Sequence, residues 1–109
     1  MATQFKNKVV KEVGIVPILA LETDAATRST IIGLNLANLT DFIQYISISV
    51  KDDTSVEGYL MKDVMIPANS SLKALAAGEK LILAPSNELY LVASSNESLD
   101  AVISYVDIV

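Results

Sequence analysis

The sequence predicts an all-β fold, an antiparallel β-sandwich of jelly-roll-like type with about eight or nine short strands. Apolar residues alternate with polar or small ones over short runs, which is the period of a strand with one buried face. Glycine and proline interrupt the chain at intervals that suit strands better than helices. A chain of 109 residues supports one domain with one core. We therefore expect a single sandwich domain over residues 1–109.

The expected strands follow from this alternation, with a turn between each pair. The segments LETDAATRS, NLTD, KDDTS, PANSS, PSNE and SSNESLD are rich in residues that bond their own backbone or preset φ for a turn. Between them the predicted strands are residues 9–13, 15–21, 29–37, 42–51, 56–65, 71–75, 80–83, 88–94 and 101–108. One segment has an alternative: SLKALAAGEKL, residues 71–81, contains good helix formers, with Gly78 where a helix would end, so a helical turn is also compatible.

The stretch STIIGLNLANLTDFIQYISISVKD, residues 29–52, has an unusual second face. Its alternation predicts one face buried in the core, made of Ile32, Leu34 and Leu36, then Ile46, Ile48 and Val50. The opposite face carries small or neutral residues where a wet sheet usually carries charges. These residues are Ile31, Gly33, Asn35 and Ala37, then Ile43, Tyr45, Ser47 and Ser49.

The last two predicted strands, ELYLVAS and DAVISYVDIV, are likewise apolar on both faces. An antiparallel sheet with one side in water does not show this pattern. The pattern therefore predicts that a second sheet face contacts another surface.

Composition excludes several classes of function. The chain has no cysteine and no histidine, so disulfides, thiolate nucleophiles and Ser-His or Cys-His catalytic pairs are absent. The net charge of −5 argues against nucleic-acid binding, which needs clustered Lys and Arg. We expect no enzyme, with no catalytic, cofactor-binding or metal-ligating residues and no cofactor.

The first 21 residues indicate where the chain is located and whether its N-terminus is ordered. The longest uncharged apolar stretch, VGIVPILAL at residues 13–21, is too short for a membrane helix and is interrupted by Pro17, so we expect no membrane partner. The N-terminus lacks the pattern of a secretory signal, which favours retention in a cytoplasm. Lys6, Lys8 and Lys11 make residues 1–11 formally basic, while the remainder carries five basic and thirteen acidic residues. Residues 1–8 are either a flexible basic arm or a frayed terminus that the lysines keep in solution.

Two groups of acidic residues are candidates for a metal or catalytic site. Asp52, Asp53 and Glu57 form the densest cluster, but they lack the spacing of a calcium loop and fit a solvated turn. Asp63 and Asp107 lie within predicted strands, where we expect them to point outward at an edge or to pair with a lysine.

Three stretches of the chain, TIIGLNLANLT, VMIPANSSLKAL and SLDAVISYVDI, together resemble a family of small all-β virion proteins of tailed bacteriophages. Members accompany the capsid, neck or tail. The likeness extends from about Gly14 to Ile108, in the same order and at similar spacing. In the turn at Asn69 the family pattern leads us to expect glycine, followed by a more apolar run than KALAAGEK.

The resemblance implies a non-enzymatic protein that is made in the host cytoplasm and built in many copies into a virion, as a capsid decoration or a neck or tail component. Its partners would be other copies of itself and other virion proteins. On the neutral sheet faces we expect the contact residues Ile31, Asn35, Tyr45, Ile103 and Tyr105.

A receptor- or carbohydrate-binding β-sandwich module is the alternative function. It would use aromatic side chains as a groove for a ligand. The candidates are Tyr45, Tyr59, Tyr90, Tyr105, Phe5 and Phe42.

Overall fold

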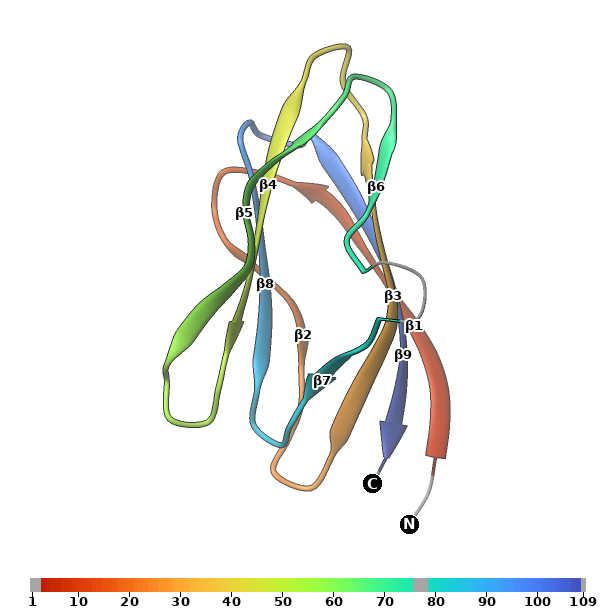
Figure 1. Cartoon of the computed structure of the whole chain (residues 1–109), viewed down its shortest axis with the longest axis vertical. Helices are drawn as coiled ribbons and strands as arrows, with labels where there is room; N and C mark the ends of the chain where they lie inside the picture. The colour runs from red at the N-terminus through yellow and green to blue at the C-terminus, as the bar shows by residue number, and fades with distance from the viewer. Residues whose placement is uncertain (1–2, 76–78, 109) are drawn as a thin grey trace.

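The computed structural model of the chain describes residues 3–75 and 79–108. The regular elements of these residues are all β-strands (Figure 1). In chain order they are β1 (Thr3–Val13), β2 (Ile18–Glu22), β3 (Arg28–Asn38), β4 (Gln44–Lys51), β5 (Glu57–Ile66), β6 (Ser71–Lys73), β7 (Leu81–Leu83), β8 (Glu88–Ala93) and β9 (Leu99–Ile108).

The strands form two antiparallel sheets packed face to face (Figure 1). Sheet A has the order β1-β9-β3-β6, and β7 pairs with another part of β3 on the same side as β6. Sheet B has the order β2-β8-β4-β5. Consecutive strands repeatedly cross from one sheet to the other, which is the arrangement of a jelly roll, with β6 and β7 sharing one strand position. The predicted all-β sandwich is confirmed.

The core lies between the two sheets and is made of aliphatic side chains. Alternate residues of β3, β4, β8 and β9 point into it over most of their length, as the period of two predicts. The fully buried large side chains are Val13, Ile31, Leu34, Leu36, Ile46, Ile48, Ile66, Leu83, Leu89, Leu91, Leu99 and Ile103. Among the residues the structure describes, no helix is long and apolar enough to cross a membrane.

A β-bulge in β3 decides which residues of the opening stretch face the core. Ile31 lies opposite Tyr105 and Gly33 lies opposite Ser104, so Ile32 is an extra residue on β3. A bulge shifts the alternation by one residue. As a result Ile31 is buried, whereas Ile32 is exposed and the sequence-based assignment of these two residues was wrong. Beyond the bulge Leu34 points inward, as predicted.

Strand β1 begins much earlier than predicted. Residues 3–8 pair in continuous register with β9, so that Phe5 lies opposite Val106 and Lys8 lies opposite Ile103. The expectation of a basic arm at residues 1–8 is therefore corrected for residues 3–8, which form part of sheet A. Residues 1 and 2 lie outside the described part of the chain.

The segment from Asn69 to Lys80 contains one short strand in its described residues. Residues 71–73 pair with β3 as β6, and the two residues that follow form a bend. The rest of the alternative helical turn, including Gly78, lies outside the described residues. Asn69 has a φ of 54°, in the left-handed region where Asn is better tolerated than most residues, which explains how it replaces the expected glycine.

Candidate assembly surfaces

The outer surface of sheet A, here called face A, is apolar at many exposed positions. The register of the sheet places residues of β1, β9, β3 and β7 side by side on it. Phe5 is 80% exposed, and Val9, Ile32, Ile82 and Val102 are also exposed. Face A consists of Phe5, Asn7, Val9, Thr30, Ile32, Gly33, Asn35, Ile82, Val102, Ser104 and Val106.

Three rows of side chains run across the strands of face A. The first row contains Phe5, Val106, Thr30 and Ile82. The next contains Asn7, Ser104 and Gly33, which are small or polar, and the third contains Val9, Val102 and Asn35. The middle row is lower than its neighbours because its residues are small. A hollow of about 330 Å³ lies here, lined by Phe5, Lys6, Asn7, Ile32, Ser104 and Tyr105.

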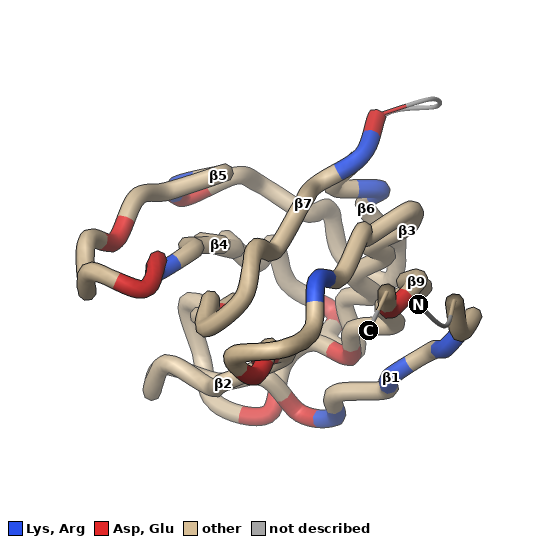
Figure 2. The backbone as a smooth tube through the Cα atoms, turned by 90° about the horizontal axis from the view of Figure 1, so that it is seen from below, with Lys and Arg blue, Asp and Glu red and all other residues tan. Residues whose placement is uncertain are grey.

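No residue of face A is charged, and the charged side chains next to it lie at its border. Arg28 is opposite Ile108 at one end, Asp100 is opposite Ala37 at the other, and Lys73 pairs with Asn35 at the side of the sheet. Figure 2 shows the same distribution, with β3 and β9 largely free of charge and the acidic β4–β5 turn on the far side of the molecule from β1. A neutral centre with a charged border is typical of a protein interface.

The outer surface of sheet B, here called face B, differs because its exposed Tyr45, Tyr59 and Met65 are mixed with polar and charged residues that interact with one another. Ser49 lies between Tyr59 and Tyr90 on the neighbouring strands, and its hydroxyl donates to Glu57 at 2.7 Å. The Lys62 ammonium lies 4.6 Å from the centroid of the Tyr59 ring. The pKa of Tyr90 is raised, mainly by desolvation of its side chain and to a lesser extent by its hydrogen bond to Glu88.

The five expected contact residues lie in three different environments. Ile31 and Ile103 are both 0% exposed, and they belong to the chain's own core. They are not accessible to another chain, which corrects their assignment. Asn35 is exposed on face A and Tyr45 is exposed on face B, so these two lie on opposite sides of the molecule. Tyr105 is half-buried and packs against the core.

Sequence reasoning missed other residues of face A. Phe5 was predicted only as an aromatic candidate for a ligand groove, and Val9 lay in a predicted strand with no outward face assigned, because residues 1–8 were interpreted as an arm or a frayed terminus outside the sheet. The alternation in QFKNKVV, with lysines at Lys6 and Lys8 between uncharged residues, is a signal that could have shown them. Ile82 lies on β7, whose three residues are too short to define a face.

An ion pair ties the two terminal strands together at one end of sheet A. The Lys6 Nζ lies 3.0 Å from Asp107 Oδ2, and the Ser29 hydroxyl donates to the other oxygen of the same carboxylate. Asp107 is 8% exposed, so these partners compensate a largely buried charge. The hydrogen bond to Asp107, and then its negative charge, raise the pKa of Lys6. The prediction that Asp107 pairs with a lysine is confirmed. Tyr105 and Leu21 also line the polar pocket of about 290 Å³ at this site.

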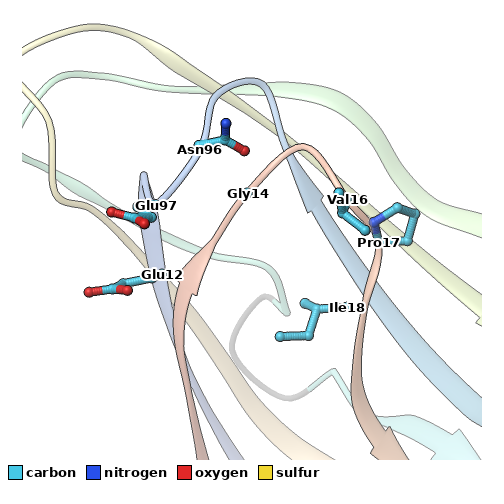
Figure 3. A pocket seen from close by; sticks show the side chains of 7 residues that line it. All are labelled: Glu12, Gly14, Val16, Pro17, Ile18, Asn96 and Glu97. Atoms are coloured by element: carbon cyan, nitrogen blue, oxygen red, sulfur yellow. The ribbon is translucent and has the colours of Figure 1, made fainter.

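A second open pocket, of about 380 Å³, lies where the β1–β2 turn approaches the β8–β9 loop (Figure 3). Its lining residues are Glu12, Gly14, Val16, Pro17, Ile18, Asn96 and Glu97. The carboxylates of Glu12 and Glu97 point to the same side, and both residues have positive φ, 56° and 51°. Over residues 3–75 and 79–108 no group of three or more acidic side chains could hold a metal ion.

The acidic β4–β5 turn uses its first carboxylate to hold the turn. Asp52 Oδ1 accepts hydrogen bonds from the backbone of Thr54 at 2.9 Å, from its hydroxyl at 2.7 Å, and from the backbone of Val56 at 3.0 Å. The hydroxyl bond of Thr54, and then the backbone of Val56, lower the pKa of Asp52. The arrangement is that of a turn in which Asp bonds its own backbone. Asp63, as expected, is exposed on the edge strand β5.

Comparison with known proteins adds similarities of fold. No family model and no curated protein matches the sequence. A solved structure from Bacillus endospore appendages, described as a family of disulfide-linked pili, is similar with a TM-score of 0.58 and 4% identity over 96% of this chain and 86% of that one. At this identity the similarity shows the sandwich fold alone.

Two viral structures are similar at lower scores. A chain of the cyanophage Pam1 capsid has a TM-score of 0.45 and 10% identity over 95% of this chain and 84% of its own. The VP2 protein of infectious bursal disease virus, in T=1 particles, has a TM-score of 0.48 and 10% identity over 96% of this chain. This chain spans only 31% of that VP2 chain.

Proposed function

We propose that the chain is a non-enzymatic structural protein of a bacteriophage virion, serving as a capsid decoration or cement protein or as a neck or tail accessory component. Face A carries this proposal. It is an extended sheet surface with exposed Phe5, Val9 and Ile82 and with no charge. Monomeric proteins in aqueous solution rarely expose a continuous apolar patch of this kind.

The energy available from face A is adequate for assembly. Burying one Val, Ile or Phe side chain contributes about 1.5–3 kcal/mol. Face A exposes Phe5, Val9, Ile32, Ile82 and Val102, which together can offset an association cost of about 4–15 kcal/mol. The Bacillus appendage protein, which shares the fold, is described as part of a pilus, so the same architecture serves subunit assembly there. Other copies of the chain and other virion proteins are the partners that this function requires.

The composition of purified virions tests the proposal. Particles of the phage that encodes the chain are purified on a density gradient and analysed by quantitative mass spectrometry. We expect the chain in a fixed ratio to the major capsid protein. A chain that is abundant in the lysate but absent from the particles would overturn the proposal.

A matched pair of substitutions shows whether face A makes the attachment. Val102→Asp places a charge on face A, between Val9 and Asn35, and we expect it to remove the chain from the particles. Phe42→Asp is the control, because Phe42 is 74% exposed in the β3–β4 loop and lies outside face A. Equal incorporation of both variants would show that a different surface attaches the chain.

A receptor- or carbohydrate-binding module is the second candidate, and face B favours it. Tyr59 and Tyr45 are exposed there, close to the carboxylates of Glu57 and Asp63. A glycan array with the wild type and with Tyr59→Ala tests it. Binding that depends on Tyr59 would support a sugar site, whereas an array without signal would count against it.

A further inference from the structure

We propose that face A is the contact surface of a symmetric dimer, in which two copies of the chain pack sheet A against sheet A. In this dimer the Phe5 ring of each copy enters the hollow of the other copy, between Ile32 and Ser104. The inference rests on the proposed function, because it identifies a second copy of the chain as a partner of face A, the surface on which that function depends.

The shape of face A fits itself. Phe5 is 80% exposed and projects from the first row of side chains, while the hollow of about 330 Å³ lies beside it in the middle row. The middle row is open because a Cβ on Gly33 would have only the Ser104 side chain near it, at 3.7 Å. An apolar cavity of roughly 150 Å³ accommodates benzene, so the hollow has room for a phenyl ring.

A twofold axis is the symmetry that satisfies both copies at once. In a symmetric dimer the same patch serves on both partners, so that a projection on one copy meets a hollow on the other and the reverse contact forms in the same way. Phe5 and Ser104 are close neighbours on β1 and β9, two strands that pair directly. One axis beside them therefore allows two equivalent ring-in-hollow contacts.

The area of face A together with its charged border approaches what a stable dimer needs. Strand β3 has 11 residues and so is roughly 36 Å long, and four strand positions span roughly 19 Å. The whole face with its border thus measures roughly 700 Å². A specific interface buries about 800 Å² on each partner, which is close to this value.

Charge does not oppose the contact of two identical faces. Identical charged surfaces repel, but the residues of face A are uncharged, and Arg28, Asp100 and Lys73 lie at its border. Lys6, which helps to line the hollow, is paired with Asp107 of its own chain. The free edge of sheet A is a poorer contact for a second copy. Strand β1 carries Lys6 and Lys8 on that edge, and two such edges would bring lysines together.

Sedimentation equilibrium of the purified full chain tests the dimer. We expect a reversible monomer–dimer equilibrium for the wild type, with a dissociation constant that rises at least about tenfold for Phe5→Ala. Phe42→Ala removes a ring of similar exposure from a loop outside face A and should leave the equilibrium unchanged. A wild type that remains monomeric at all concentrations, or a dimer that is indifferent to Phe5→Ala, would overturn the proposal.

Disulfide trapping reports the contact as a covalent product. The chain has no cysteine, so single Phe5→Cys and Ser104→Cys variants can be mixed and oxidised, and intact mass shows which pairs form. The proposed dimer predicts the mixed product of Phe5→Cys with Ser104→Cys. A mixture of Phe42→Cys with Ser104→Cys should give much less. Equal yields from the two mixtures would refute the predicted contact.

The outcome for the dimer is separate from the outcome for the virion. If the wild type is monomeric but the chain is found in purified particles, the dimer is wrong and face A contacts a different virion protein. If the chain dimerises through Phe5 but is absent from the particles, the dimer holds and the virion function is wrong.

Discussion

Lys6 and Asp107 join the first strand to the last, with 3.0 Å between the Lys6 Nζ and Asp107 Oδ2. The pair forms beside a paired stretch of β1 and β9, and Ser29 on β3 donates to the same carboxylate. Three strands of sheet A are therefore linked at one end through a single carboxylate. This link helps to explain why residues 3–8 lie in the sheet, and it also aligns Phe5 on face A.

Substitution of Lys6 should weaken the fold in a way that depends on pH. The pKa of Lys6 is raised above its ordinary value of 10.5, so the ion pair contributes its full stability below about pH 10.5 and loses it as the pH rises through the higher value in the folded state. We expect Lys6→Met to unfold at lower urea than the wild type at about pH 7, and this difference to shrink at about pH 11.5. Urea unfolding at the two pH values measures it.

Lys8→Met is the matched control for this prediction. Lys8 lies on the same strand, and in the described part of the chain the one ion pair is that of Lys6 with Asp107. The Lys8→Met substitution should therefore change the stability of the fold little at either pH. If both variants lose the same stability, or if the effect of Lys6→Met persists unchanged at alkaline pH, the ion pair does not stabilise β1.

Acid should destabilise the turns that aspartates hold. The backbone of Ala26 lowers the pKa of Asp24 below its ordinary value of 3.8, and hydrogen bonds from Thr54 and Val56 lower that of Asp52 in the same direction. A lowered pKa in the folded state gives stability that is present above about pH 3.8 and is lost as the pH falls through the lower folded value.

Asp52→Asn tests this dependence. We expect the loss of stability on acidification to be smaller for Asp52→Asn than for the wild type, because the variant has no charge to lose at position 52. The control is Asp53→Asn, an exposed neighbour in the same turn. Thermal unfolding from pH 6 down to about pH 2.5 measures both. An acid profile of Asp52→Asn that coincides with that of the wild type would contradict the prediction.

Asn38 should be one of the polar residues on which the fold depends most. It is buried at the end of β3, and its amide nitrogen donates to three backbone carbonyls while its oxygen accepts from Thr40. Two of these carbonyls also accept from Thr40 or Ser70, and the third is the buried carbonyl of Ile66, so we expect Asn38→Ala to lower the free energy of unfolding by about 1–3 kcal/mol. The carbonyls belong to Phe42, Ile66 and Pro67.

Asn35→Ala provides the comparison for Asn38 on the same strand. Asn35 is exposed on face A, and its removal should change stability by less than about 0.5 kcal/mol in the monomer. Denaturant unfolding by circular dichroism measures both variants. Similar losses for the two asparagines would show that the buried hydrogen bonds of Asn38 contribute little.

The sandwich could be predicted from sequence because its signals are local. Alternation shows most of the strands, and the polar segments between them show most of the turns, including the one that Asp52 holds. The neutral second face was also predictable. Asp41, in the turn between β3 and β4, is the one charged residue between residues 31 and 50.

The parts that sequence could not provide depend on distant contacts. The bulge at Ile32 is visible only in the pairing of β3 with β9, and it exchanges Ile31 and Ile32 between the core and face A. Strand β9 is apolar on both sides, so alternation does not decide whether Val102 or Ile103 is buried. The start of β1 depends on its pairing with a strand at the other end of the chain.

Substitutions at Ile103 and Val102 should separate the core from face A. Ile103 is 0% exposed between the sheets, so Ile103→Ala should lower the free energy of unfolding by about 2–5 kcal/mol through the cavity it leaves. Val102 is its neighbour on β9 and points outward, opposite Val9 and Asn35. At a concentration where the chain is monomeric, Val102→Ala should change stability by less than about 0.5 kcal/mol.

The same two variants should reverse their order when self-association is measured. Val102 lies in the third row of face A, next to the hollow, so Val102→Ala should raise the dissociation constant of the dimer, whereas Ile103→Ala should alter it little while the chain remains folded. Urea unfolding and sedimentation equilibrium on the same samples give both quantities. If Val102→Ala destabilises the monomer as much as Ile103→Ala does, Val102 belongs to the packing of the fold and face A is not a free surface.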